Sequence, residues 1–89
     1  MKKIYLNPTD SRKSFYNKCY VTIDEQGNKT LTSYNTEVAR ITKEGKIERL
    51  WDGYSATTMR HINAFVDTFT DETGAGGKTW WDGLEVVRK

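Results

Sequence analysis

Residues 55–69 carry the most regular hydrophobic pattern in the chain, and this pattern limits the fold more than any other feature. Their large apolar side chains recur at helical spacing and fall within an arc of about 120°. These side chains belong to Met59, Ile62, Phe65, Val66 and Phe69. Ser55 is suited to cap the helix, because its hydroxyl can accept an amide proton from Thr57 or Thr58. The helix is expected to end near residues 70–73, and its apolar stripe needs a second layer to cover it.

The chain before this helix alternates with the two-residue period of half-buried strands. A first strand is predicted over residues 15–23, with Phe15, Cys19, Val21 and Ile23 on one face and Tyr16, Lys18, Tyr20 and Thr22 on the other. Residues 29–42 form a longer extended stretch with a bend or bulge near residues 33–35, and residues 47–51 form the next strand. Together these elements predict an α+β fold. A small antiparallel sheet of three or four strands, arranged as a meander, packs against one amphipathic helix, and a short helical turn follows near the C-terminus.

The 89 residues are predicted to form a single domain. Residues 1–13 hold the only proline and few apolar side chains, which favours an irregular N-terminal arm. A glycine-rich connector is expected over residues 74–78. The C-terminal segment, residues 79–89, should begin with one helical turn capped by Thr79 and Asp82.

Charge and cysteine content exclude several classes of protein. Fourteen Lys and Arg residues oppose twelve Asp and Glu residues, so the net charge of +2 identifies no partner. A single cysteine excludes an internal disulfide framework and a cysteine-based zinc site. No apolar run approaches the roughly 20 residues of a membrane span, and no signal-peptide core follows the start. We therefore expect a cytoplasmic protein without membrane contact, either a monomer or a homodimer formed through a sheet edge.

The residue types that usually carry catalysis are isolated from one another. His61 is the only histidine, with no carboxylate four residues away and no evident link to a serine, so a place at the surface or the core boundary is expected. Cys19 lies on the predicted inward face, where cysteine behaves as a small hydrophobic residue. The run Gly76–Thr79 is no phosphate-binding loop, because Glu72 stands where the first glycine is needed. The sequence predicts no catalytic residue, cofactor or metal site.

Negative charge gathers near the C-terminal end, where residues 67–85 hold five acidic residues and one lysine. Two adjacent tryptophans lie in the same stretch, and exposed tryptophan beside acidic groups is typical of a protein-binding hot spot. The candidate partner-binding residues are Asp67, Asp71, Glu72, Trp80 and Trp81. At least one indole is expected to dock on the core, and packing of both there is the simpler alternative.

Basic and aromatic residues gather near the other end of the chain. Such interleaving is typical of surfaces that bind single-stranded nucleic acid, where each stacked base contributes about 1–3 kcal/mol. The candidate nucleic-acid-binding residues are Arg12, Lys13, Tyr16, Lys18 and Tyr20, and an ordinary outer sheet face is the alternative. A candidate anion site lies at the start of the helix, where capping alone is the competing explanation. It consists of Ser55, Thr57, Thr58 and Arg60.

Three motifs resemble, in this order, a family of small proteins encoded by phages, plasmids and other mobile elements of Gram-positive bacteria. They are residues 14–18 (SFYNK), residues 33–39 (SYNTEVA) and residues 54–62 (YSATTMRHI). The resemblance supplies no catalytic residue. It implies a mobile-element setting, in which small proteins without catalytic machinery commonly bind and occlude a host enzyme, as anti-CRISPR and other anti-defence proteins do.

The sequence therefore supports two hypotheses of function. The first is a non-enzymatic protein that binds and inhibits or modulates a host protein or ribonucleoprotein complex, above all a defence complex. The second is a small accessory protein that binds single-stranded nucleic acid. An enzyme ranks last, because no pair of catalytic groups is evident.

Overall fold

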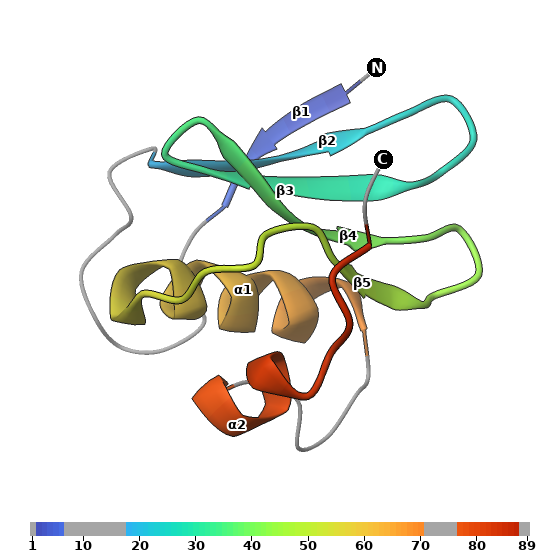
Figure 1. The fold of residues 1–89 in the computed structure, drawn as a ribbon. Helices are drawn as coiled ribbons and strands as arrows, with labels where there is room; N and C mark the ends of the chain where they lie inside the picture. Colours follow the sequence, from blue (N-terminus) through green and yellow to red (C-terminus); the bar gives the residue numbers. More distant parts are fainter. Residues whose placement is uncertain (1, 7–17, 71–76, 88–89) are drawn as a thin grey trace.

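A computed structural model gives the structure of the chain and describes residues 2–6, 18–70 and 77–87. In chain order its elements are β1 (Lys2–Tyr5), β2 (Cys19–Ile23), β3 (Lys29–Ser33), β4 (Thr36–Ile41), β5 (Ile47–Arg49), α1 (Ala56–Phe69) and α2 (Gly77–Asp82). The strands lie side by side in this order in one antiparallel sheet, and α1 covers one face of it (Figure 1). The predicted α+β class and the meander are confirmed, with five strands instead of three or four.

The additional strand is β1. An irregular arm over residues 1–13 was the expectation, and it is wrong for residues 2–5, which pair with β2 from Lys2 opposite Ile23 to Tyr5 opposite Tyr20. Only Ile4 among the four is partly buried, so the segment has too little hydrophobic alternation to reveal a strand. Its extended shape comes from backbone hydrogen bonds to β2. Residues 7–13 of the arm, and residues 15–17 of the first predicted strand, lie outside the described residues.

The predicted division of residues 29–42 into two strand segments is confirmed, and its cause is a tight hairpin turn. Tyr34 and Asn35 form the turn, with φ angles of 51° and 80°. Two successive positive φ angles are the mark of the type I′ turn, whose twist suits a two-residue hairpin. A register shift follows beside Leu31 and Thr32, where Val38 on β4 is the extra residue.

The core lies between the inner face of the sheet and α1. Its members from the sheet and α1 are Cys19, Val21, Leu31, Val38, Ala39, Ile41, Met59, Ile62, Ala64, Phe65 and Val66. The helix boundaries agree with the prediction, because the Ser55 hydroxyl accepts the Thr58 N–H at 3.1 Å and Thr70 is the C-terminal cap. Neither helix of the described ranges is long and apolar enough to span a membrane.

The second helix begins earlier than predicted. Gly77 and Lys78 already belong to α2, so they are not part of a connector, and residues 74–76 lie outside the described residues. Thr79 lies within the helix and therefore does not cap its start. The expected short C-terminal helix itself is confirmed.

A buried arginine attaches α2 to the sheet. Arg49, on β5, sends its guanidinium N–H groups to the carbonyl oxygens of Trp51 at 2.8 Å, Trp81 at 2.9 Å, Gly53 at 3.3 Å and Leu84 at 3.4 Å. Its guanidinium carbon lies 4.7 Å from the centre of the Trp81 ring. Positive charge at the C-terminal end of a helix is electrostatically favourable, so this side chain joins α2 to β5 without a carboxylate.

Candidate ligand-binding face

The sheet has two faces with different surroundings. Alternation along β2 turns Cys19 and Val21 toward α1, while Lys18 and Tyr20 point to the opposite side. The paired strands extend this second side, which we call the outer face, because Tyr5 lies opposite Tyr20 and Lys3 opposite Thr22. The alternation predicted for residues 18–23 is therefore confirmed, and it brings the basic and aromatic side chains of β1 and β2 together.

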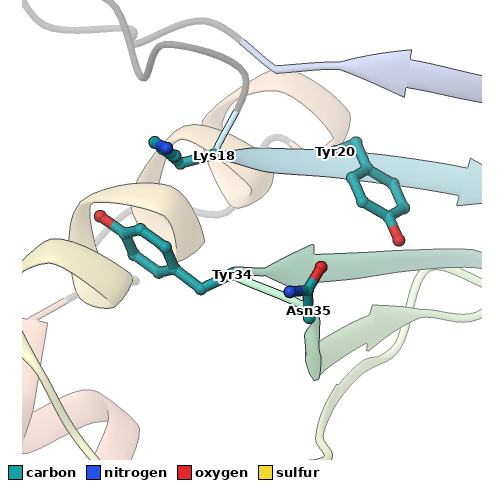
Figure 2. Close-up of a pocket in the computed structure, with 4 residues that line it drawn as sticks. All are labelled: Lys18, Tyr20, Tyr34 and Asn35. Carbon is teal, nitrogen blue, oxygen red and sulfur yellow. The ribbon is translucent and has the colours of Figure 1, made fainter.

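A hollow of about 460 Å³ opens on the outer face where β2 begins beside the β3–β4 turn. Its walls are Lys18, Tyr20, Tyr34 and Asn35, and we call it the Tyr34 hollow. The carboxamide of Asn35 lies between the rings of Tyr34 and Tyr20, and the Lys18 ammonium lies on the Tyr34 side (Figure 2). The volume is within the range of about 300–1,000 Å³ that small-ligand sites occupy. Two flat rings, an amide and an ammonium thus line one open space.

The backbone fixes two walls of the hollow relative to each other. The Tyr34 N–H donates to the Lys18 carbonyl oxygen at 2.9 Å, which closes the end of the β2–β3 ladder. Tyr34 itself has a positive φ, a conformation that costs a bulky residue roughly 1–2 kcal/mol, and its side chain is 52% exposed. The turn therefore presents an aromatic ring to solvent at a position where glycine or asparagine would relieve strain.

Lys3, Tyr5 and Tyr20 form a second group beside the hollow. The Lys3 ammonium nitrogen lies 4.2 Å from the centre of the Tyr20 ring and 5.1 Å from that of Tyr5. The two rings meet edge to face at 6.0 Å. Such cation–π contacts hold the ammonium on the outer face. Within the described residues, neither Lys3 nor Lys18 forms an ion pair, so both positive charges face solvent.

A buried polar network supports the hollow from inside. The His61 Nδ1 atom lies 2.8 Å from the Ser33 hydroxyl, which lies 3.2 Å from the Thr58 hydroxyl. The Tyr34 ring packs beside the His61 ring at 5.6 Å. Burial, together with the neighbouring charge of Arg60, lowers the pKa of His61 to about 4. The imidazole is therefore neutral at ordinary pH and helps to hold the base of the turn.

Two expectations about His61 are wrong. It was placed at the surface or boundary, yet its side chain is only 1% exposed, because α1 turns it toward β3. It was also expected to have no link to a serine, and Ser33 provides one across the core. The serine and the imidazole are both buried, and burial and the Arg60 charge both disfavour the protonated imidazole. The pair is therefore a buried hydrogen bond that stabilises the core.

Cys19 is fully buried on the inner face, as predicted. Burial raises the pKa of its thiol to about 12. A nucleophilic cysteine needs the reverse, a lowered pKa and access to solvent. The thiol is thus a packing group.

The candidate partner-binding residues of the C-terminal part do not form one surface. Trp81 is fully buried, with its indole N–H donating to the Gly53 carbonyl oxygen at 2.9 Å, so the alternative of core packing holds for this residue. Trp80 is half-buried against the core, and Asp67 is exposed on α1. Asp71 and Glu72 lie outside the described residues.

The structure also does not bring together all members of the other two candidate sets. Of the nucleic-acid-binding candidates, Lys18 and Tyr20 come together in the hollow, while Arg12, Lys13 and Tyr16 lie outside the described residues. The candidate anion site has two of its hydroxyls engaged inside the protein. Ser55 accepts the Thr58 N–H, and the buried Thr58 hydroxyl contacts Ser33. Thr57 is exposed and Arg60 is partly buried.

Sequence reasoning missed Tyr34 and Asn35, the two residues that complete the hollow. The available signal is the slip of the alternation at residues 33–35, which indicates a bend or bulge and also fits a two-residue hairpin turn that presents both side chains. In the described ranges, no three His, Cys, Asp or Glu side chains gather in a position to hold a metal ion.

The fold and this face define a small α+β protein with an open hollow on the outer face of an antiparallel meander. A family model matches residues 4–83, and the chain belongs to that family, a family of unknown function (DUF8033). Comparison with curated proteins and with solved structures finds no match.

Proposed function

We propose that this chain is a binding module that takes up single-stranded nucleic acid on the outer face of its sheet. The observation that carries the proposal is the Tyr34 hollow, where two tyrosine rings and a lysine share one open space. Proteins that bind single strands combine aromatic rings, on which bases stack, with cationic groups that follow the phosphates. Both kinds of group occur here on one side of a sheet.

The charge of the face supports the same proposal. Lys3 and Lys18 flank the tyrosines of β1 and β2. At the β4–β5 side of the outer face, Arg40 and Glu48 neutralise each other in an ion pair of 2.7 Å. Two lysine charges therefore lie beside the aromatic rings, where they can attract a phosphate backbone, while Glu37 on β4, opposite Thr32, adds one negative charge to the same face.

Fluorescence anisotropy with a labelled mixed-sequence single strand tests the proposal. Affinity should fall steeply as salt rises, because each phosphate contact releases condensed counterions. Lys18→Gln should weaken binding several-fold. Lys46→Gln is the matched control, since it removes the same charge from the exposed β4–β5 turn at the other end of the sheet (Figure 1). Absence of binding at low salt, or equal weakening by the two variants, would contradict the proposal.

A second candidate function is the inhibition or modulation of a host protein or ribonucleoprotein through the same face. Tyr5 and Tyr34 are 49% and 52% exposed, and tyrosine is enriched among the residues that dominate protein interfaces. The resemblance to mobile-element proteins favours this type of role. Capture of a host protein by the intact chain, lost in the Tyr34→Asn variant, is the expected result. Equal capture by both chains would remove the face from this role.

A further inference from the structure

The Tyr34–Asn35 turn has two features that hairpin formation alone does not require. A type I′ turn is best served by Asn-Gly, whereas this turn places a bulky ring first and an amide second. The backbone of Tyr34 has a strained φ angle. Backbone strain of this kind persists where the surrounding structure enforces it, often at ligand sites. Asparagine tolerates a positive φ, so the turn explains residue 35, whereas the turn does not require a ring at residue 34, which contacts His61 and is still 52% exposed.

The Asn35 side chain is available to a ligand. It is exposed, it borders the hollow, and its carboxamide makes no hydrogen bond to the part of the chain that the structure describes. A carboxamide offers one acceptor and one donor side by side. The adenine base presents the complementary pair, N7 as acceptor and the N6 amino group as donor, and asparagine is a usual partner for that edge.

The other walls of the hollow match the remaining parts of a nucleotide. Tyr34 supplies an exposed ring on which a base can stack, beside the Asn35 amide that would read its edge. Lys18 supplies a positive charge next to that ring, where the flanking phosphate would lie. Its carbonyl oxygen accepts the Tyr34 N–H, so the stacking and phosphate-binding residues are held together before any ligand arrives.

We propose that the Tyr34 hollow is a subsite for one adenine nucleotide of a single strand, with the base stacked on Tyr34, its N6/N7 edge on Asn35 and the flanking phosphate at Lys18. This inference rests on the proposed function and adds a base preference to it. Lys18 acts on every sequence alike, whereas Asn35 discriminates among bases.

Competition anisotropy on the full chain tests the preference, with short oligo(A), oligo(C) and oligo(U) strands displacing a labelled strand at low salt. Oligo(A) should compete about tenfold better than the other two, the discrimination expected of one two-point contact to a base. Asn35→Gly and Asn35→Asp should reduce this preference to less than about twofold. Glycine accepts the positive φ without strain and aspartate tolerates it, so both variants are expected to fold.

The outcomes separate the two proposals. Because oligo(A) stacks on itself, the loss of preference in the Asn35 variants decides the result, and a ranking that both variants retain would overturn the adenine subsite. Equal affinity for the three strands, or preference for another base, would also overturn it, while the single-strand proposal would stand. Failure of all three strands to bind would overturn both.

Discussion

The two faces of the sheet use polar residues in opposite ways. On the inner face the Ser33 hydroxyl, the His61 imidazole and the Arg49 guanidinium are buried, and each is hydrogen-bonded within the protein. On the outer face, Lys18 and Asn35 border an open hollow and are exposed. Buried polar groups must find partners because an unsatisfied one is costly, so the inner set is committed to the fold.

This contrast shows which polar side chains stabilise the fold and which remain accessible to a ligand. The histidine and the cysteine, which would be the first candidates in a catalytic search, are packing groups with pKa values shifted by burial to about 4 and about 12. The residues on which the proposed binding rests lie instead in a turn and in the outward positions of β1 and β2. Residue type alone is therefore a weaker guide than the side of the sheet on which a residue falls.

Truncation of the largest buried side chain should have the greatest effect on folding. Trp81→Ala removes a fully buried indole and its hydrogen bond to Gly53, so the free energy of unfolding should fall by about 3–5 kcal/mol. The adjacent Trp80→Ala is the matched control and should cost less than half as much, because Trp80 is only partly buried. Urea denaturation measures both. Equal losses of unfolding free energy would contradict the full burial of Trp81 and the partial burial of Trp80.

Acidification should destabilise the inner face through His61. Its pKa in the folded chain, about 4, is below the ordinary value of 6.5, so the unfolded chain binds the extra proton between these values. Stability is therefore fully present above about pH 6.5 and falls by about 3 kcal/mol as pH drops toward 4.

The His61→Asn variant isolates this contribution to the pH dependence. Asparagine places a polar atom near the position of Nδ1 and does not titrate, so its free energy of unfolding should change less between pH 7 and pH 4 than that of the parent chain. Urea denaturation at both pH values measures the difference. Parallel pH profiles for the two proteins would contradict the buried neutral imidazole.

Loss of the Arg49 guanidinium should cost about 2 kcal/mol, because Arg49→Met removes the guanidinium donors to the carbonyl oxygens of Trp51, Trp81 and Leu84, of which the Trp81 oxygen still accepts the Leu84 N–H. Arg49→Lys keeps the charge but loses the planar fork, so an intermediate loss is expected. Hydrogen exchange of the α2 amides should accelerate in both variants. Protection unchanged in α2 would contradict the role of Arg49 in attaching this helix.

The smallest effect on stability is expected on the outer face. Tyr34→Gly should change the free energy of unfolding by less than about 1 kcal/mol, since relief of left-handed strain offsets the lost contact with His61 and the greater freedom of glycine when unfolded. The same variant should weaken single-strand binding several-fold in the anisotropy assay. A loss of several kcal/mol in the free energy of unfolding would show that Tyr34, like the buried residues of the inner face, is needed for folding.

Local pattern was sufficient to predict α1, with its Ser55 cap, and the alternation of β2, since each depends on neighbours within a few positions. It was insufficient for β1, which has a single partly buried residue and becomes a strand through pairing with residues about fifteen to twenty positions away. The same limit explains the misplacement of His61, whose partner Ser33 is 28 positions distant. Long-range contacts therefore decided β1 and the place of His61, whereas the early start of α2 at Gly77 and the turn at Tyr34 and Asn35 are local features.

The site was predictable to the same partial extent. Lys18 and Tyr20 were identified, because basic and aromatic residues alternate there. Tyr34 and Asn35 come from another hairpin and meet them only through the β2–β3 pairing, in which Cys19 lies opposite Ser33. Docking of at least one indole on the core was expected and holds for Trp81, but a sequence cannot tell which of two adjacent indoles faces inward.

Chemical-shift mapping of the ¹⁵N-labelled chain during titration with a single-stranded oligonucleotide tests the central claim most directly. The largest amide shifts are expected at residues 3–5, 18–20 and 34–35, around the Tyr34 hollow, while the exposed side of α1 around Asp67 should stay unchanged. Shifts centred on α1 or α2, with the outer face unaffected, would contradict the central claim.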